Sequence, residues 1–96
     1  MGRLSYRVEY HEKVEREDIP ALGSVTKDRV RKAIETKLII APDIFGKPLR
    51  RSLAGRRKLR VGDYRIIYRV EKMLVKILVI GHRSWVYKEE GTRRSS

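Results

Sequence analysis

Residues 47–69 hold a dense group of positively charged side chains. They contain nine Lys or Arg and a single acid, Asp63, whereas residues 1–46 contain nine Lys or Arg and eight Asp or Glu. Repulsion within such a group costs stability, so its presence predicts an anionic partner. Guanidinium and ammonium groups bind phosphate through charge-assisted hydrogen bonds, and they stabilise negative charge that develops in a transition state. The segment is therefore a candidate for binding a polyphosphate chain and for chemistry at phosphorus.

The spacing of these cations predicts that several of them share one surface. Side chains in a strand return to the same face every second residue, which places Arg56, Lys58 and Arg60 together. If the later strands are antiparallel neighbours, the cations expected to join this patch are Arg65, Arg69 and Arg83. The alternative is that these charged side chains only keep the edge of the sheet solvated, which is a common role of charged residues on strands. The nine-to-one ratio of cations to acids favours polyphosphate binding over that alternative.

The first half of the chain predicts one strand and two helices that would support this surface. Apolar and polar residues alternate over 4–10, as in a half-buried strand. The charged stretch 11–19 predicts a short helix. Ser24 is a suitable N-cap for a second helix, in which apolar residues recur at helical spacing over 30–38.

The second half predicts a series of antiparallel strands. The Gly-Asp pair at 62–63 is a plausible hairpin turn between strands at 56–61 and 64–70. Residues 74–82 form the most apolar segment and predict the central strand of the sheet. Residues 83–88 are expected to continue as an edge segment.

This order of elements predicts the α+β class, with a single domain over residues 1–88. The domain would consist of an N-terminal strand, two helices, and then a sheet of three or four antiparallel strands. We expect the helices on one sheet face, which leaves the opposite face open to solvent. Residues 89–96 lack apolar side chains and predict a disordered tail.

Composition excludes several classes of protein. The chain has no cysteine, which excludes disulfides and thiolate metal sites and fits a reducing cytoplasm. Its two histidines lie far apart in the sequence, so a histidine metal cluster is not expected. No apolar run approaches the roughly 20 residues that span a bilayer. We therefore expect a cytoplasmic protein that uses no metal or cofactor and does not bind a membrane.

Two motifs resemble the RelE/ParE toxin family. The segment Arg57–Tyr68, RKLRVGDYRIIY, is similar to the family signature K/R-L-R-x-G-x-Y-R-x-x-Y, which marks two strands. The segment Ile80–Tyr87, IGHRSWVY, is similar to the closing V/I-x-H/K-R-x-x-x-Y of the same family. The resemblance extends over roughly residues 4–88 with both helices in place. Each motif alone is a weak signal, whereas the pair at this separation is fairly specific.

The resemblance implies the toxin of a type II toxin–antitoxin system, of the RelE-like mRNA interferase kind. Such an endoribonuclease cuts messenger RNA in the ribosomal A site. Matching residue by residue, it implies that Lys58 and Arg65 are catalytic, that Arg83 lies near the scissile phosphate, and that Tyr87 is the family's C-terminal tyrosine. Arg56 replaces a second lysine of the ribosome-dependent relatives, which keeps the charge but removes a group able to transfer a proton.

The reaction implied is attack by a ribose 2′-oxygen on the adjacent phosphorus, which leaves a 2′,3′-cyclic phosphate and a free 5′-hydroxyl. Arg65 and Arg83 would stabilise charge on the non-bridging oxygens, and no metal is needed. Tyr87 or Lys58 would move or orient the proton of the 2′-hydroxyl. For Tyr87 the alternative is an aromatic side chain that only packs against the edge of the sheet.

Further side chains are expected to contact RNA without reacting. His82 alternates with Leu78 and Ile80, which favours a histidine at the edge of the core over a general acid. Trp85 could stack on a splayed base or cap the end of the core. The residues expected to bind RNA are Arg56, Arg57, Arg60, Arg69, His82 and Trp85.

The family resemblance also implies a cognate antitoxin encoded beside the toxin. An open basic sheet face predicts that an acidic or amphipathic antitoxin segment covers it. Two other functions stay open, a ParE-like DNA gyrase inhibitor without nuclease activity and a passive nucleic-acid-binding module. The joint presence of Lys58, Arg65, Arg83 and Tyr87 favours the nuclease, because neither alternative needs a tyrosine beside cations.

Overall fold

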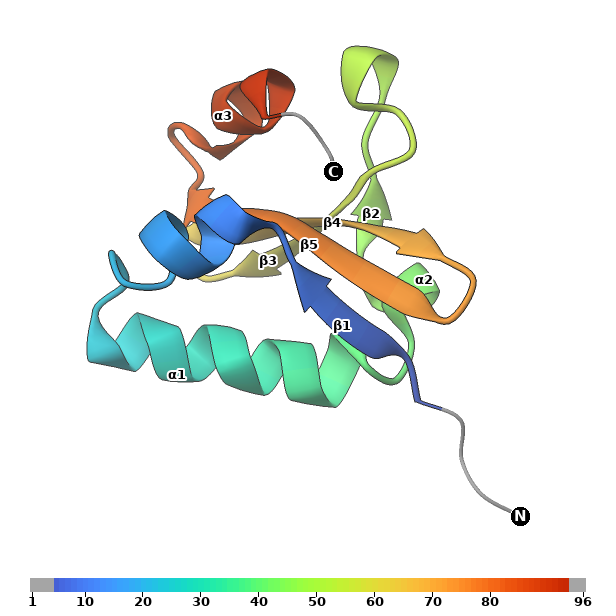
Figure 1. The fold of residues 1–96 in the computed structure, drawn as a ribbon, viewed down its shortest axis with the longest axis horizontal. Helices are drawn as coiled ribbons and strands as arrows, with labels where there is room; N and C mark the ends of the chain where they lie inside the picture. The colour runs from blue at the N-terminus through green and yellow to red at the C-terminus, as the bar shows by residue number, and fades with distance from the viewer. Residues whose placement is uncertain (1–4, 94–96) are drawn as a thin grey trace.

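The computed structural model describes residues 5–93 as a five-stranded sheet with helices on both faces (Figure 1). In chain order the elements are β1 (Arg7–Tyr10), η1 (Val14–Asp18), α1 (Ser24–Ala33), η2 (Ile34–Leu38), α2 (Pro42–Phe45), β2 (Lys47–Pro48), η3 (Arg51–Leu53), β3 (Arg57–Val61), β4 (Tyr64–Glu71), β5 (Leu74–His82) and α3 (Val86–Thr92). The helical turns η1 and η2 are of the π type, and η2 continues α1 directly. Within the described part of the chain, each helix is too short or too polar to cross a membrane.

The sheet has the strand order β1-β5-β4-β3-β2. Strands β2 to β5 pair in an antiparallel manner, whereas β1 pairs in parallel with β5. The most apolar strand, β5, is therefore interior but not central, because β1 adds to its outer side and leaves β4 in the middle. The Gly-Asp turn joins β3 to β4 as expected, and Gly62 there has φ of 61°, a left-handed conformation that favours glycine.

The sheet face that packs on α1 and η2 holds the main core (Figure 1). The buried helical residues are Val30, Ala33, Ile34 and Leu38, which confirms the apolar stripe expected from the sequence. They pack against alternate residues of the strands, which include Leu59, Ile66 and Ile80. Gly23 occupies the N-cap position and Ser24 is the first helical residue, so Ser24 does not cap α1 as expected.

The opposite sheet face is partly covered by α3, which corrects the expectation that helices lie on one face only (Figure 1). Val86 is fully buried there against Ile67, Leu78 and Val79. The register of β4 and β5 shifts between Ile67 and Tyr68, and two consecutive residues of β5 join this second cluster. The extra apolar surface gives α3 a docking site, so residues after 85 form a helix rather than an edge strand.

The predicted disordered tail is wrong as far as residue 93, and its remaining residues, 94–96, lie outside the described part. Helix α3 continues to Thr92, and the guanidinium of Arg93 donates hydrogen bonds of 2.8 Å to both carboxylate oxygens of Asp18. It also donates to the carbonyl oxygen of Leu78 at 2.9 Å. Composition was misleading here because buried charges, rather than apolar side chains, hold the segment in place.

Candidate nucleic-acid interface

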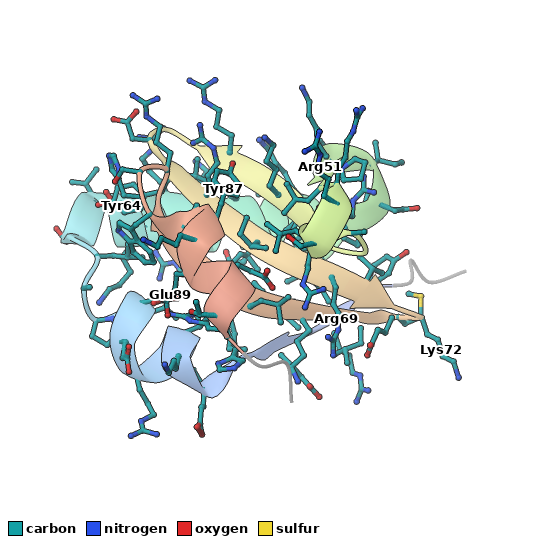
Figure 2. All side chains as sticks on the ribbon, turned by 90° about the horizontal axis from the view of Figure 1, so that it is seen from above. Arg51, Tyr64, Arg69, Lys72, Tyr87 and Glu89 are labelled. Carbon is teal, nitrogen blue, oxygen red and sulfur yellow. The ribbon has the colours of Figure 1, made fainter. Side chains whose placement is uncertain are left out.

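Lys58 of β3 and Tyr87 of α3 meet on the sheet face that carries α3. Lys58 lies opposite Ile67 in the register of β3 and β4, and Ile67 packs beneath α3. The Nζ atom of Lys58 is 5.5 Å from the centroid of the Tyr87 ring, within the range at which a cation is attracted to an aromatic face. Figure 2 shows Tyr87 on the side of α3 that is turned toward β3. The fold thus brings together two predicted catalytic residues that are far apart in the sequence.

Arg65 lies on the same face of β4, paired in register with Arg60 of β3. Its Nη1 atom donates hydrogen bonds of 2.9 Å to the carbonyl oxygens of Gly62 and Tyr64. Both bonds are donated by the same nitrogen, so they orient the planar guanidinium at the β3–β4 turn through one of its three nitrogen atoms. Arg65 is therefore held in a fixed orientation, which is the property that electrostatic catalysis requires.

Arg83 approaches the same turn from the end of β5. Its backbone N–H donates to the carbonyl oxygen of Asp63 at 2.8 Å, and its Nε atom is 3.6 Å from a carboxylate oxygen of Asp63. The Arg83 side chain remains 62% exposed. Arg65 and Arg83 thus flank one turn, and a phosphate bound there would meet one hydrogen-bonded guanidinium and one exposed guanidinium.

Trp85 lies on the sheet beside Arg65. Its six-membered ring covers Gly81, where an added Cβ atom would overlap the ring carbons, and Gly81 is opposite Arg65 in the register of β4 and β5. The residue is nonetheless 42% exposed. An exposed aromatic surface next to an oriented arginine is suited to stacking with a nucleobase.

We expect Gly81→Ala to displace Trp85 from the sheet. The new methyl group would occupy the position of the ring, and an overpacked contact of this kind typically costs about 1–3 kcal/mol. Trp85 is the only tryptophan in the chain, so its fluorescence emission should shift to the red in the variant. Gly91→Ala is the matched control, because an added Cβ at Gly91 meets no atom within 4 Å. Identical emission from the Gly81→Ala variant and the wild type would contradict this placement of Trp85.

Arg56 anchors α3 to the sheet. Its Nε atom donates a 2.7 Å hydrogen bond to Glu90, whose side chain is 2% exposed, while the Arg56 side chain is 25% exposed. The second carboxylate oxygen of Glu90 has no hydrogen-bond partner among the described residues. Sequence reasoning missed Glu90, although its position four residues after the buried Val86 places both on the same side of a helix.

Arg57 points to the opposite sheet face and does not join this group. Its Nη2 atom donates to the carbonyl oxygens of Asp43 at 2.8 Å and Gly46 at 2.5 Å. The neighbouring hydroxyl of Tyr68 is buried and donates to the carbonyl oxygen of Pro42 at 2.6 Å. Burial raises the pKa of Tyr68 above its usual value, although the hydrogen bond and charge of Arg57 act in the opposite direction. Arg57 therefore fastens the α2 loop to the sheet.

Arg69 and His82 also lie away from the pair Lys58 and Tyr87. The Nε atom of Arg69 is 3.1 Å from Glu71, and Figure 2 shows Arg69 toward the end of the sheet that carries Lys72. The ring of His82 meets Tyr64 edge-on with centroids 5.5 Å apart, on the main-core side of the sheet. The Nδ1 atom of His82 lies 3.1 Å from the backbone N–H of Ser84 and 2.9 Å from the hydroxyl oxygen of the same residue.

The four predicted catalytic residues thus form two pairs, Lys58 with Tyr87 on the sheet face that carries α3, and Arg65 of the same face with Arg83 at the β3–β4 turn. The first pair couples a phenol to an ammonium group, and the second presents two guanidinium groups at a turn. Together they can bind a phosphodiester, stabilise charge on its oxygens and place a proton-transferring group beside it. Within residues 5–93, no three His, Asp or Glu side chains gather closely enough to hold a metal ion.

Comparisons of this chain with known proteins agree on one family of toxins. Residues 8–87 match the family described as the ParE toxin of type II toxin–antitoxin system, parDE. The Toxin RelG of Mycobacterium tuberculosis is 49% identical over 45 residues, which cover 45% of this chain and 52% of that protein. The chain therefore spans about half the length of the curated relative that it matches.

Solved structures of similar fold carry related names. The toxin–antitoxin complex RelBE2 from Mycobacterium tuberculosis contains a chain with 33% identity and a TM-score of 0.77, covering 86% of this chain and 97% of that one. A mutant of Escherichia coli toxin RelE in the free state has 25% identity and a TM-score of 0.68, covering 90% and 94%. The archaeal RelE–RelB complex from Pyrococcus horikoshii has 27% identity and a TM-score of 0.56, covering 81% and 94%.

Proposed function

Because this chain belongs to the ParE toxin family of type II toxin–antitoxin systems, within the RelE/ParE superfamily, we propose that it is a metal-independent endoribonuclease that cleaves messenger RNA on the ribosome. The observation that carries the proposal is the contact of Lys58 with Tyr87 on the sheet face of Arg65, with Arg83 at the β3–β4 turn. An inhibitor that acted only by binding another protein would not need a phenol held beside cations.

In the proposed reaction, the 2′-oxygen of one ribose attacks the adjacent phosphorus as its proton leaves. The bond from phosphorus to the 5′-oxygen of the next nucleotide then breaks, and that oxygen takes up a proton. The products are a 2′,3′-cyclic phosphate and a free 5′-hydroxyl, so atoms and charge balance without a co-reactant. Negative charge grows on the non-bridging oxygens, and Arg65 and Arg83 stabilise it at the β3–β4 turn.

Tyr87 is assigned to the 2′-hydroxyl and Lys58 to the orientation of Tyr87. A phenol oxygen can accept or share the proton of the 2′-hydroxyl, and the ammonium of Lys58 over the ring holds Tyr87 in place. Trp85 would hold a neighbouring base, so that the ribose is aligned for in-line attack. His82, by its distance from this face, is left with a structural role.

The proposal includes an antitoxin that covers this face. Among the similar structures, RelBE2 is a toxin–antitoxin complex and the archaeal protein is a RelE–RelB complex. The chain carries a formal net charge of +12, so an acidic or amphipathic antitoxin segment would neutralise the cations of the site and block RNA at the same time.

The direct test is primer extension on a translated message after the toxin is expressed in bacteria. Cuts within codons of translated regions, with 5′-hydroxyl ends downstream, are the expected result. Intact messages accompanied by DNA damage would instead indicate a gyrase inhibitor and would overturn the nuclease proposal.

We expect Tyr87→Phe to slow cleavage about 100-fold, because a general acid or base typically contributes at least that factor. The variant keeps the aromatic ring and its contact with Lys58, so α3 should remain docked. Single-turnover cleavage of a ribosome-bound message measures the effect. Cleavage at the wild-type rate in this variant would remove Tyr87 from the mechanism.

A further inference from the structure

A second cationic surface lies between α1 and the β3–β4 turn, on the main-core side of the sheet. It is a hollow of about 450 Å³, which we call the α1 groove. Its charged lining residues are Arg29, Lys32, Lys37 and Arg60, and the small residues Ala33 and Gly62 line it between them. Tyr87, Lys58 and the other catalytic candidates are absent from its lining, so this is a separate surface.

The cations of the α1 groove have no acidic counterpart. No Asp or Glu lines the groove, and within residues 5–93 none of its four cations forms an ion pair. Elsewhere on the same helix Arg31 does pair with Asp28, at 3.1 Å. Arg29, Lys32 and Arg60 are also exposed, so their charges are available to a ligand.

Neighbouring residues hold two cations of the groove in place. The Nη1 atom of Arg29 lies 3.0 Å from the position that a Cβ atom would occupy on Gly62, so Arg29 rests against the turn because Gly62 has no side chain. Lys37 is held partly by the ring of Phe45, with its Nζ atom 5.9 Å from the centroid. Two of the four cations are thus positioned before any ligand arrives.

Arg60 connects the α1 groove with the proposed cleavage site around the edge of β3. Strand β2 pairs only with Arg57 and Lys58, so Arg60 lies on the part of β3 beyond β2. Arg60 pairs in register with Arg65, and it also lines the groove. Arg60 is therefore shared by the cations on the α3 side of the sheet and those of the α1 groove.

The chemistry of the α1 groove suits RNA better than a protein partner. A protein interface needs apolar or aromatic anchors in its centre, whereas the apolar members of this lining, Ala33 and Val61, are buried. The other side of α1 offers what a protein would use, a hollow lined by Val30, Ile34 and Ile19. A phosphate backbone needs only well-placed cations and room to approach.

We propose that the α1 groove binds the phosphate backbone of RNA outside the cleavage site, so that bound RNA contacts both sides of β3. The RNA is either the target strand itself, continuing past the scissile bond, or a folded RNA that presents the target. The inference rests on the proposed function for the kind of nucleic acid, but binding at the groove does not require cleavage.

The test compares two double variants of the full-length chain that lose equal charge from the same helix. Arg29→Gln with Lys32→Gln removes two groove cations, and Lys27→Gln with Arg31→Gln removes two exposed cations from the other side of α1. Two probes are titrated over a range of salt, a single-stranded 2′-O-methyl RNA that cannot be cleaved and intact bacterial ribosomes. Thermal unfolding verifies that both variants fold.

The groove variant should bind at least one probe more weakly than the control variant, with the slope of log K against log salt reduced by about 1 to 2. Loss with the single strand assigns the groove to the target strand, and loss with ribosomes alone assigns it to folded RNA. Equal affinity and slope for both variants on both probes would overturn the proposal, as would weakened binding of an antitoxin alone.

If Arg83→Ala abolishes cleavage while the groove variant keeps wild-type RNA affinity, the groove inference fails and the nuclease proposal is retained. If instead the groove variant binds RNA more weakly than the control variant and the wild type cleaves no message, the groove inference is supported and the nuclease proposal fails.

Discussion

Arg83→Ala should lower the rate of message cleavage by about 10²–10³-fold, the typical loss when one donor to a developing oxyanion is removed. The side chain lies at the β3–β4 turn beside Arg65, where the proposed mechanism places the non-bridging oxygens. A single-turnover cleavage assay on ribosome-bound message measures the loss. In cells, the same variant should permit growth where the wild-type toxin arrests it.

The effect of Arg83→Ala can be separated from loss of folding. Arg83 is 62% exposed and its partner Asp63 is 69% exposed, so their 3.6 Å ion pair contributes at most about 1 kcal/mol to stability. Arg69→Ala is the matched control, since it also removes a cation from the sheet but at the end far from Tyr87 (Figure 2). Growth arrest by the Arg83→Ala variant equal to that of the wild type would remove Arg83 from the catalytic site.

Arg93→Ala should lower the free energy of unfolding by about 3–5 kcal/mol, because it leaves the buried Asp18 carboxylate without its cation. The two side chains are 3% and 4% exposed, and their closest atoms are 2.8 Å apart. Burial alone would lower the pKa of Arg93, but the hydrogen bonds and charges of Asp18 and Glu89 outweigh it and raise that pKa. The guanidinium therefore remains charged in the folded protein, and urea denaturation measures what its removal costs.

An exposed pair provides the control for this prediction. Arg16 and Glu12 are 3.8 Å apart with side chains 75% and 72% exposed, so Arg16→Ala should change stability by less than about 1 kcal/mol. The double variant Asp18→Ala with Arg93→Ala should lose less than the sum of the two single losses, by roughly 0.5–3 kcal/mol. Additive losses, or a loss for Arg93→Ala as small as that for Arg16→Ala, would contradict the buried pair.

The stability of α3 also bears on the catalytic site. Arg93 and Arg56 fasten α3 at Asp18 and Glu90, and α3 carries Tyr87 over Lys58. Weakening either ion pair should therefore loosen Tyr87 and reduce cleavage without touching a reacting group. This couples the packing of the C-terminal helix to the proposed chemistry.

The sequence by itself determined the features that depend on local geometry. The period-two alternation placed Lys58 and Arg60 on one face of their strand, because the side-chain direction in a strand follows from the backbone alone, and Arg65 joins them through the antiparallel pairing of β3 with β4. The Gly-Asp pair predicted the β3–β4 turn, since Gly62 can adopt the positive φ that the turn requires. The apolar stripe of α1 and η2 was likewise visible, because helical periodicity is a local property.

Only the tertiary structure decided which charges are free and which are structural. Arg56 and Arg57 are adjacent in an equally basic stretch, yet one pairs with Glu90 and the other binds backbone carbonyl groups on the opposite face. Arg93 is 75 residues from Asp18 in the chain, so no local pattern shows that they meet. The value of a charge pair depends on the burial and distance of both partners, and the fold sets these only after the strands and helices have packed.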